Sequence, residues 1–325
     1  MKAITRRSLL QSAAPLALAG AWPLQAQEAY PNRPIRLLVP FPAGALTDSL
    51  GRMVAERLRG ALGQPVVVEN RPGSGTLLGA GVIAKSPPDG YSLMVATSTT
   101  LAIAPSMYAS SPVAPGDLTG VAMIGTVSLF LVTRKELKAT NLSELVSEMR
   151  SRPGQLNYGS PGSGTMHHLI IEMLKAEEKI NAVHIPYQGS IPALSDLISG
   201  RIDFMFLDAV AALPQIQAGK INVLAVAVDK RLASMPQVPT VGESYPRLDL
   251  QAWQTIAAPK GTPAEIVNRL NAEINKSLSS AEGRAALMRV GVEANPMSVT
   301  ALNELIARDE KRLGDLVRSI GLKAT

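Results

Sequence analysis

The chain has 325 residues, a formal net charge of +6 and no cysteine. The lack of cysteine excludes thiol catalysis, disulfides and Cys-based metal sites. Its positive charge is mild and evenly scattered, which argues against a nucleic-acid partner. With 46% hydrophobic residues, a chain of this length can bury a core without disulfides, and it usually forms two domains.

Residues 1–26 have the pattern of a cleaved secretory signal, because a basic start (Lys2, Arg6, Arg7) precedes an apolar stretch. Small residues offer cleavage after Ala21 or Ala26, and we predict Ala26. The paired arginines also suit a twin-arginine signal, so both export routes stay open. Removing these three basic residues from the net charge of +6 leaves +3. No apolar run reaches the ~18 residues of a membrane span.

Apolar β-branched runs alternate with helical patterns along the rest of the chain. Strands are predicted at 35–41, 66–69, 92–97, 129–133, 156–158, 182–187, 202–207 and 223–228. Nearly continuous apolar runs are typical of strands buried on both faces, so we expect parallel sheets covered by helices. The fold class is therefore α/β and doubly wound.

Two lobes are predicted, with residues 27–125 and 253–325 in the first and 126–252 in the second. The chain is expected to cross between them near Gly125 and Ala252. Helical patterns at 263–278 and 298–320 should pack back on the first lobe. Two crossings make a hinge, and ligands of such sheets bind outside the carboxyl ends of the strands.

The same strand–loop–helix pattern occurs twice, with its loops at residues 42–48 and 159–165. In each copy an apolar strand leads into a Gly/Pro/Ser loop that opens a helix. The free N–H groups of a helix start form an anion site, and neither loop contains Lys or Arg. Two such loops a domain apart predict one small polar ligand gripped between two lobes.

The second loop does not match the sequence motifs of nucleotide-binding or serine-hydrolase sites. Gly159 and Gly164 have phosphate-loop spacing but lack the lysine that must follow, and no serine lies in Gly-x-Ser-x-Gly. His168 and Glu172 share a helix face and could ligate a metal, which leaves a metal-assisted hydrolase open. A third ligand is missing, so we predict no metal and no cofactor.

Three polar groups fall where a ligand would bind. Asp48 lies in the first turn of its helix, where it either caps the helix or faces an ammonium group or water. The hydroxyls at 97–100, beginning with Thr97 and Ser98, follow the strand 92–97. Asp208 follows the strand 202–207 in the second lobe. All three positions are strand or helix ends near the expected cleft.

The chain resembles the Bug-type extracytoplasmic solute receptors, the substrate-binding subunits of tripartite tricarboxylate transporters. The resemblance covers essentially the whole mature chain. It is carried by Tyr30-Pro31, Val39-Pro40-Phe41-Pro42-Ala43-Gly44, Val68-Glu69-Asn70-Arg71-Pro72-Gly73, Pro87-Pro88-Asp89-Gly90-Tyr91, Tyr158-Gly159-Ser160-Pro161-Gly162-Ser163-Gly164, His184-Ile185-Pro186-Tyr187-Gln188-Gly189 and Pro239-Thr240-Val241. The ordered set is specific, whereas each block alone is weak.

The resemblance implies a type II periplasmic binding protein fold and a periplasmic, non-enzymatic receptor. It implies that loop amides, hydroxyls and waters hold a small carboxylate: a dicarboxylate, a hydroxy acid, an acidic amino acid or an aromatic carboxylate. The expected partners are membrane transporter subunits, and we expect a monomer. An exported sensory receptor for the same ligands is an alternative, because both roles use the same binding physics.

Residues that match the family's motifs are the first site candidates: Phe41, Ala43, Gly44, Asp48, Ser160, Gly164 and Thr165. Position in the same loops and strand ends adds Ala45, Thr47, Thr97, Ser98, Gly162, Ser163, His168 and Asp208. The family usually has glycine where this chain has Ala45. Alanine resists a positive φ, so either the backbone is conventional there or the loop geometry differs.

Overall fold

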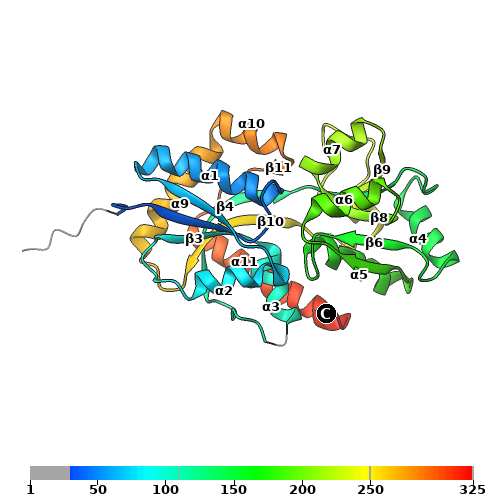
Figure 1. Ribbon diagram of the computed structural model, residues 1–325, viewed down its shortest axis with the longest axis horizontal. Coiled ribbons are helices and arrows are strands. Elements are labelled where there is room, and N and C mark those ends of the chain that lie inside the picture. Colours follow the sequence, from blue (N-terminus) through cyan, green and yellow to red (C-terminus); the bar gives the residue numbers. More distant parts are fainter. Residues whose placement is uncertain (1–29, 109, 249, 324–325) are drawn as a thin grey trace, which may run out of the picture.

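The computed structural model describes residues 30–323 except 109 and 249, and contains two separate β-sheets. The predicted signal lies outside the described residues. Figure 1 shows the two sheets in two lobes side by side, each with helices packed around it. The predicted two-lobed α/β fold is confirmed.

The first lobe contains a six-stranded sheet in the order β11-β4-β10-β3-β1-β2. Its strands are β1 (Ile35–Val39), β2 (Val66–Asn70), β3 (Ser92–Thr97), β4 (Leu118–Val127), β10 (Ala252–Pro259) and β11 (Val292–Glu293). β1 pairs in parallel with β2 and β3, whereas β10 is antiparallel to both β3 and β4.

The second lobe contains a five-stranded sheet in the order β7-β6-β8-β5-β9. Its strands are β5 (Leu129–Arg134), β6 (Asn157–Ser160), β7 (Val183–Pro186), β8 (Phe204–Asp208) and β9 (Ile221–Ala227). β6 is parallel to β7 and β8, and β5 is antiparallel to β8 and β9.

The expectation of parallel sheets is therefore wrong at β5 and β10, and also at β11, which is antiparallel to β4. β5 and β10 adjoin the crossings between the lobes. β4 ends at Val127 and β5 begins at Leu129, so Ser128 alone links the two sheets there. The return crossing enters β10 at Ala252. Because β4 leaves the first lobe and β10 enters it, the two neighbours run in opposite directions.

Helices cover the faces of both sheets (Figure 1). The first lobe has α1 (Leu46–Leu62), α2 (Leu77–Ala84), α3 (Ala104–Met107), α9 (Ala264–Ser279), α10 (Ala281–Arg289) and α11 (Val299–Ser319), with helical turns at Ser74–Thr76 and Thr99–Ile103. The second has α4 (Leu142–Ser151), α5 (Met166–Glu178), α6 (Ser190–Ile198), α7 (Ala209–Gln217) and α8 (Val241–Ser244), with a turn at Pro246–Leu248.

The helix α1 packs on the first sheet through one apolar face. Leu50, Val54 and Leu58 recur every four residues along it and are at most 2% exposed, as expected for a buried helix face. The C-terminal helices α9 and α11 pack against β4. Within the described residues, no helix is long and apolar enough to span a bilayer. The residue limits given above for the lobes stay a proposal.

Candidate functional site

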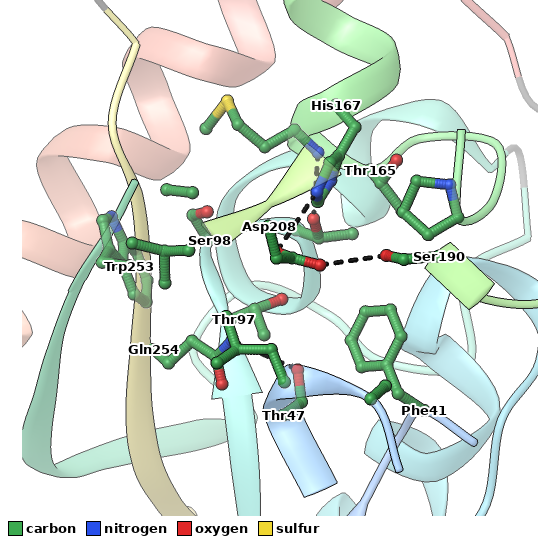
Figure 2. Close-up of a pocket in the computed structure, with 17 residues that line it drawn as sticks. Phe41, Thr47, Thr97, Ser98, Thr165, His167, Ser190, Asp208, Trp253 and Gln254 are labelled. Atoms are coloured by element: carbon green, nitrogen blue, oxygen red, sulfur yellow. Dashed lines mark hydrogen bonds and ion pairs between the residues drawn. The ribbon is translucent and has the colours of Figure 1, made fainter. Parts of the chain in front are cut away.

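A small polar cavity lies between the lobes and encloses about 40 Å³, room for about three water molecules. Figure 2 shows side chains from both lobes converging on it. The first lobe contributes Phe41, Ala45, Leu46, Thr47, Thr97, Ser98, Thr99, Val127, Ala252, Trp253 and Gln254, and the second Pro161, Thr165, Met166, His167, Ser190 and Asp208.

The first-lobe wall is the start of α1. Gly44 turns the chain with φ +83°, and Ala45 follows with φ −75° and ψ 167°. The backbone at Ala45 is therefore conventional, which answers the question raised by the missing glycine. Among the described residues, no side chain caps α1. The backbone N–H groups of Leu46 and Thr47 are consequently left for a bound anion.

Asp48 fixes this loop and does not line the cavity. Its Oδ2 accepts hydrogen bonds from Gly44 N (2.9 Å) and Arg52 Nε (3.0 Å), and its Oδ1 accepts one from Asn70 Nδ2 (2.9 Å). Burial alone would raise the pKa of this carboxyl, but these bonds hold it below its ordinary value. An ionised Asp48 thus ties the loop before α1 to β2.

The second-lobe loop, residues 159–165, is held by its own side chains. Thr165 caps α5: its Oγ1 accepts from His168 N (3.4 Å) and donates to the Gly162 carbonyl (2.8 Å). Ser160 is fully buried beneath the loop, where it donates to the Gly162 carbonyl (3.0 Å) and lies 2.7 Å from His184 Nε2. Its hydroxyl serves the loop, not the cavity.

His168 supports the same loop from below. Its Nδ1 accepts a hydrogen bond from Gly164 N (3.1 Å), and its ring stacks on His184 with 3.8 Å between centroids. Burial, with Lys175 nearby, lowers the pKa of His168 to about 4. Burial and His168 lower the pKa of His184 to about 3. Both rings are therefore neutral near pH 7.

The proposed metal pair is engaged in other contacts. His168 Nε2 lies 4.0 Å from Glu172 Oε1, and Glu172 is bonded by the Tyr158 hydroxyl and, at 2.6 Å, by Lys175 Nζ. Within the part of the chain that the structure describes, no group of three or more His, Cys, Asp or Glu could hold a metal ion.

Asp208 lies at the centre of the cavity wall in the second lobe (Figure 2). Its Oδ2 accepts a hydrogen bond from Ser190 Oγ (2.9 Å), and its Oδ1 lies 3.4 Å from His167 Nε2. Burial opposes its charge, but His167 and Ser190 outweigh it and hold the pKa of Asp208 below its ordinary value. In a hydrolytic triad the serine contacts the histidine, and the histidine contacts the aspartate. Here Ser190 and His167 each contact Asp208 instead.

One hydrogen bond lies within the first-lobe wall and another joins the two lobes. Gln254 of β10 donates from Nε2 to Thr47 Oγ1 (3.2 Å), and its Oε1 has no partner among the described residues. Met166 N donates to Thr99 Oγ1 (3.2 Å), which joins the start of α5 to the first lobe. No Lys or Arg of the described residues lines the cavity.

The structure brings seven of the fifteen candidates into the cavity lining: Phe41, Ala45, Thr47, Thr97, Ser98, Thr165 and Asp208. Eight candidates lie outside that lining: Ala43, Gly44, Asp48, Ser160, Gly162, Ser163, Gly164 and His168. The assignment of all fifteen to the ligand site stays a prediction.

Five polar or aromatic lining residues were not among the fifteen candidates: Thr99, His167, Ser190, Trp253 and Gln254. Ser190 is the first residue of α6, a helix start after the strand 182–187, and this position could have drawn attention to it. Trp253 and Gln254 sit at the predicted return crossing. No motif marks His167 over its neighbour His168.

The fold and site define a class of protein: a two-lobed periplasmic binding protein with a polar cavity at the lobe interface. Residues 50–322 match the family described as "Tripartite tricarboxylate transporter family receptor". The chain belongs to this family, which confirms the resemblance seen in the sequence. It is a solute-binding protein and not an enzyme.

Related proteins agree over nearly their whole length. Protein BugT of Bordetella pertussis is 36% identical over 314 residues, covering 95% of each chain. The structure titled "R. palustris Rpa4515 with adipate" is 33% identical with a TM-score of 0.86, covering 91% of this chain and 100% of the other. That of MatC from Rhodopseudomonas palustris with bound malate is 30% identical with a TM-score of 0.83, covering 89% and 100%.

Proposed function

We propose that this protein captures a small carboxylate between its lobes and delivers it to the membrane subunits of a tripartite transporter. The observation that carries the proposal is the uncapped start of α1, whose free amides line a buried cavity beside the hydroxyls of Thr47, Thr97 and Ser98. Such donors suit a carboxylate, because each satisfies an anionic oxygen that has lost its water.

Relatives support the chemical class. The two solved structures compared above hold adipate and malate, both carboxylates, on the same fold. We further propose that the chain is exported to the periplasm by its N-terminal signal. Delivery to a transporter is supported by the family to which the chain belongs.

A thermal-shift screen tests the ligand class. Small mono- and dicarboxylates are compared with the matching neutral amides, for example succinate with succinamide. A carboxylate at 100 times its dissociation constant should raise the free energy of unfolding by ~2.7 kcal/mol, and its amide should not. Failure of every carboxylate, or equal stabilisation by the amides, would contradict the proposal.

Delivery needs a separate test in the source cell. Deleting the gene should abolish uptake of the radiolabelled ligand found in the screen, and restoring it should recover uptake. Normal uptake combined with lost transcriptional induction by the ligand would instead identify a sensory receptor.

A further inference from the structure

The second-lobe wall of the cavity offers acceptors at Ser190 and Asp208, beside the His167 ring, whose two nitrogens have no hydrogen-bond partner among the described residues. Ser190 donates its hydroxyl hydrogen to Asp208 Oδ2, so its oxygen can only accept a hydrogen bond from a ligand. Asp208 Oδ1 has one neighbour, His167 Nε2 at 3.4 Å, a distance outside good hydrogen-bond geometry. An acceptor-only carboxylate, 9% exposed, thus faces the cavity with unused capacity.

An independent acceptor comes from the other lobe. Gln254 is only 5% exposed, its Nε2 is bonded to Thr47, and its Oε1 has no partner among the described residues. A buried amide oxygen without a partner is unfavourable, and a hydrogen-bond donor on the ligand would satisfy it. Figure 2 shows the Gln254 and Asp208 side chains facing the same space.

The donors for a carboxylate are the Leu46 and Thr47 amides at the start of α1 and the hydroxyls of Thr47, Thr97 and Ser98. Asp208 and the Gln254 Oε1, in contrast, can only accept. The site is therefore polarised between these donors and these two acceptors. A plain carboxylate group placed against Asp208 would meet a like charge in a desolvated cavity, which is costly.

We propose, resting on the function proposed above, that the cavity selects carboxylates bearing a hydrogen-bond donor, an ammonium or hydroxyl group, next to the bound carboxylate. Asp208 is the acceptor for that donor, and Gln254 Oε1 assists it. Ser190 is a positioning residue that holds the Asp208 carboxylate in place through its hydrogen bond to Oδ2. Loss of the donor leaves two buried acceptors unsatisfied, which makes discrimination strong.

Matched ligand sets test the inference by calorimetry. Each set keeps one carbon skeleton and changes only the substituent: succinate, malate and aspartate; glutarate, 2-hydroxyglutarate and glutamate; propionate, lactate and alanine. In the set that binds best, the hydroxy or amino member should bind at least tenfold tighter than the unsubstituted acid. The better of the two substituted members identifies the donor as hydroxyl or ammonium.

Variants tie the preference to the residue. Asp208→Asn should cut the preference at least tenfold, and Ser190→Ala, which keeps the carboxylate, should cut it less. Asp203→Asn is the matched control. Asp203 lies just before the first residue of β8, at the end of the strand away from Asp208, and forms an ion pair with Arg134 (2.8 Å). This variant should keep the ligand preference. Circular dichroism verifies that each variant is folded.

The outcomes separate the two proposals. If no member of any set binds and the wider screen also fails, the function proposed above is overturned. If substituted and unsubstituted acids bind equally well, only the donor preference is overturned. An unchanged preference in folded Asp208→Asn would equally overturn it, and Ser190→Ala provides the second reading if Asp208→Asn does not fold.

Discussion

Thr47 contributes both to the cavity lining and, through its hydroxyl, to a hydrogen bond that holds Gln254. It lines the cavity, lies in the first turn of α1 and accepts the hydrogen bond from Gln254 Nε2 at 3.2 Å. It therefore fixes the Gln254 amide, whose Oε1 has no partner among the described residues. A substitution at Thr47 should therefore also affect Gln254, on the neighbouring strand β10 of the same lobe.

Thr47→Val removes this hydroxyl at almost constant volume. We expect affinity for the best carboxylate of the screen to fall by ~1–3 kcal/mol, because a ligand oxygen and Gln254 Nε2 both lose a buried partner. Titration calorimetry measures the loss. Thr119→Val, on β4 outside the cavity lining, should keep wild-type affinity. Equal affinity of Thr47→Val and wild type would place the ligand elsewhere.

Adjacent histidines show what sequence alone leaves undecided about the site. His167 and His168 differ by one position, about 100° of helix rotation, so they point to different surroundings. His168 supports the loop through Gly164, whereas His167 lines the cavity. Loop positions such as Thr47 could be predicted from strand–loop–helix patterns. Ser190 and Gln254 could not, because tertiary packing brings them in from distant segments.

At the scale of elements, the start of α1 lacks the side-chain cap that α4, α5, α10 and α11 have. A cap would use the same N–H groups that we assign to the ligand. The helix therefore gives up stability that a capping serine at position 45 would supply.

Ala45→Ser tests this exchange. Its extended backbone suits an N-cap, so the serine should raise the free energy of unfolding by ~1 kcal/mol and lower carboxylate affinity. Urea denaturation and calorimetry measure the two quantities. The matched control is Ser298→Ala, which removes the cap of α11 (3.2 Å to Ala301 N) and should lower stability while keeping affinity. Unchanged affinity in Ala45→Ser would show that α1's amides do not bind the ligand.

A pH dependence follows from the start of α5. The pKa of His168 is about 4 in the folded protein against 6.5 ordinarily, so the unfolded chain binds its proton first as pH falls. The free energy of unfolding should therefore fall between about pH 6.5 and 4, and this contribution should level off below. Protonation also removes the acceptor for Gly164 N.

His168→Asn keeps an acceptor near the position of Nδ1 but cannot titrate. Its stability should fall less steeply than wild type over the same pH range, with His184 accounting for part of the remaining slope. Urea unfolding at several pH values between 7.5 and 4 gives both curves. Parallel curves would mean that His168 carries its proton equally well in both states.

Elements were predicted unevenly, and for a physical reason. Every predicted run overlaps a strand, because buried strands are apolar throughout. The crossing strands β4 and β10 were not predicted, since β4 contains Gly120 and Gly125 and β10 contains Gln254 and Thr255. Their antiparallel pairing follows from the double crossing, which local composition does not encode.

At the scale of the whole molecule, the lobes meet closely around the cavity. Met166 N bonds Thr99 across the interface, and a Cβ built on Gly291 would lie 2.0 Å from the Cβ of Ala209. A ligand must therefore enter with the lobes further apart.

We expect rotation about Ser128 and the segment before Ala252 to provide that opening. X-ray scattering should give a smaller radius of gyration for the ligand-saturated protein than for the free protein. Buffer containing the neutral amide of the ligand is the control and should leave the free profile unchanged. Superimposable free and saturated profiles would contradict the hinge.

The lack of Lys and Arg in the cavity lining also determines the net charge of the ligand-bound protein. Amides and hydroxyls stabilise an anion without neutralising it, so a loaded molecule carries the full valence of its cargo. Unless protons are taken up with the ligand, binding of a dianion makes the net charge of the receptor more negative by two. Empty and loaded forms should thus migrate differently in native electrophoresis, and a docking partner could distinguish them by charge as well as by shape.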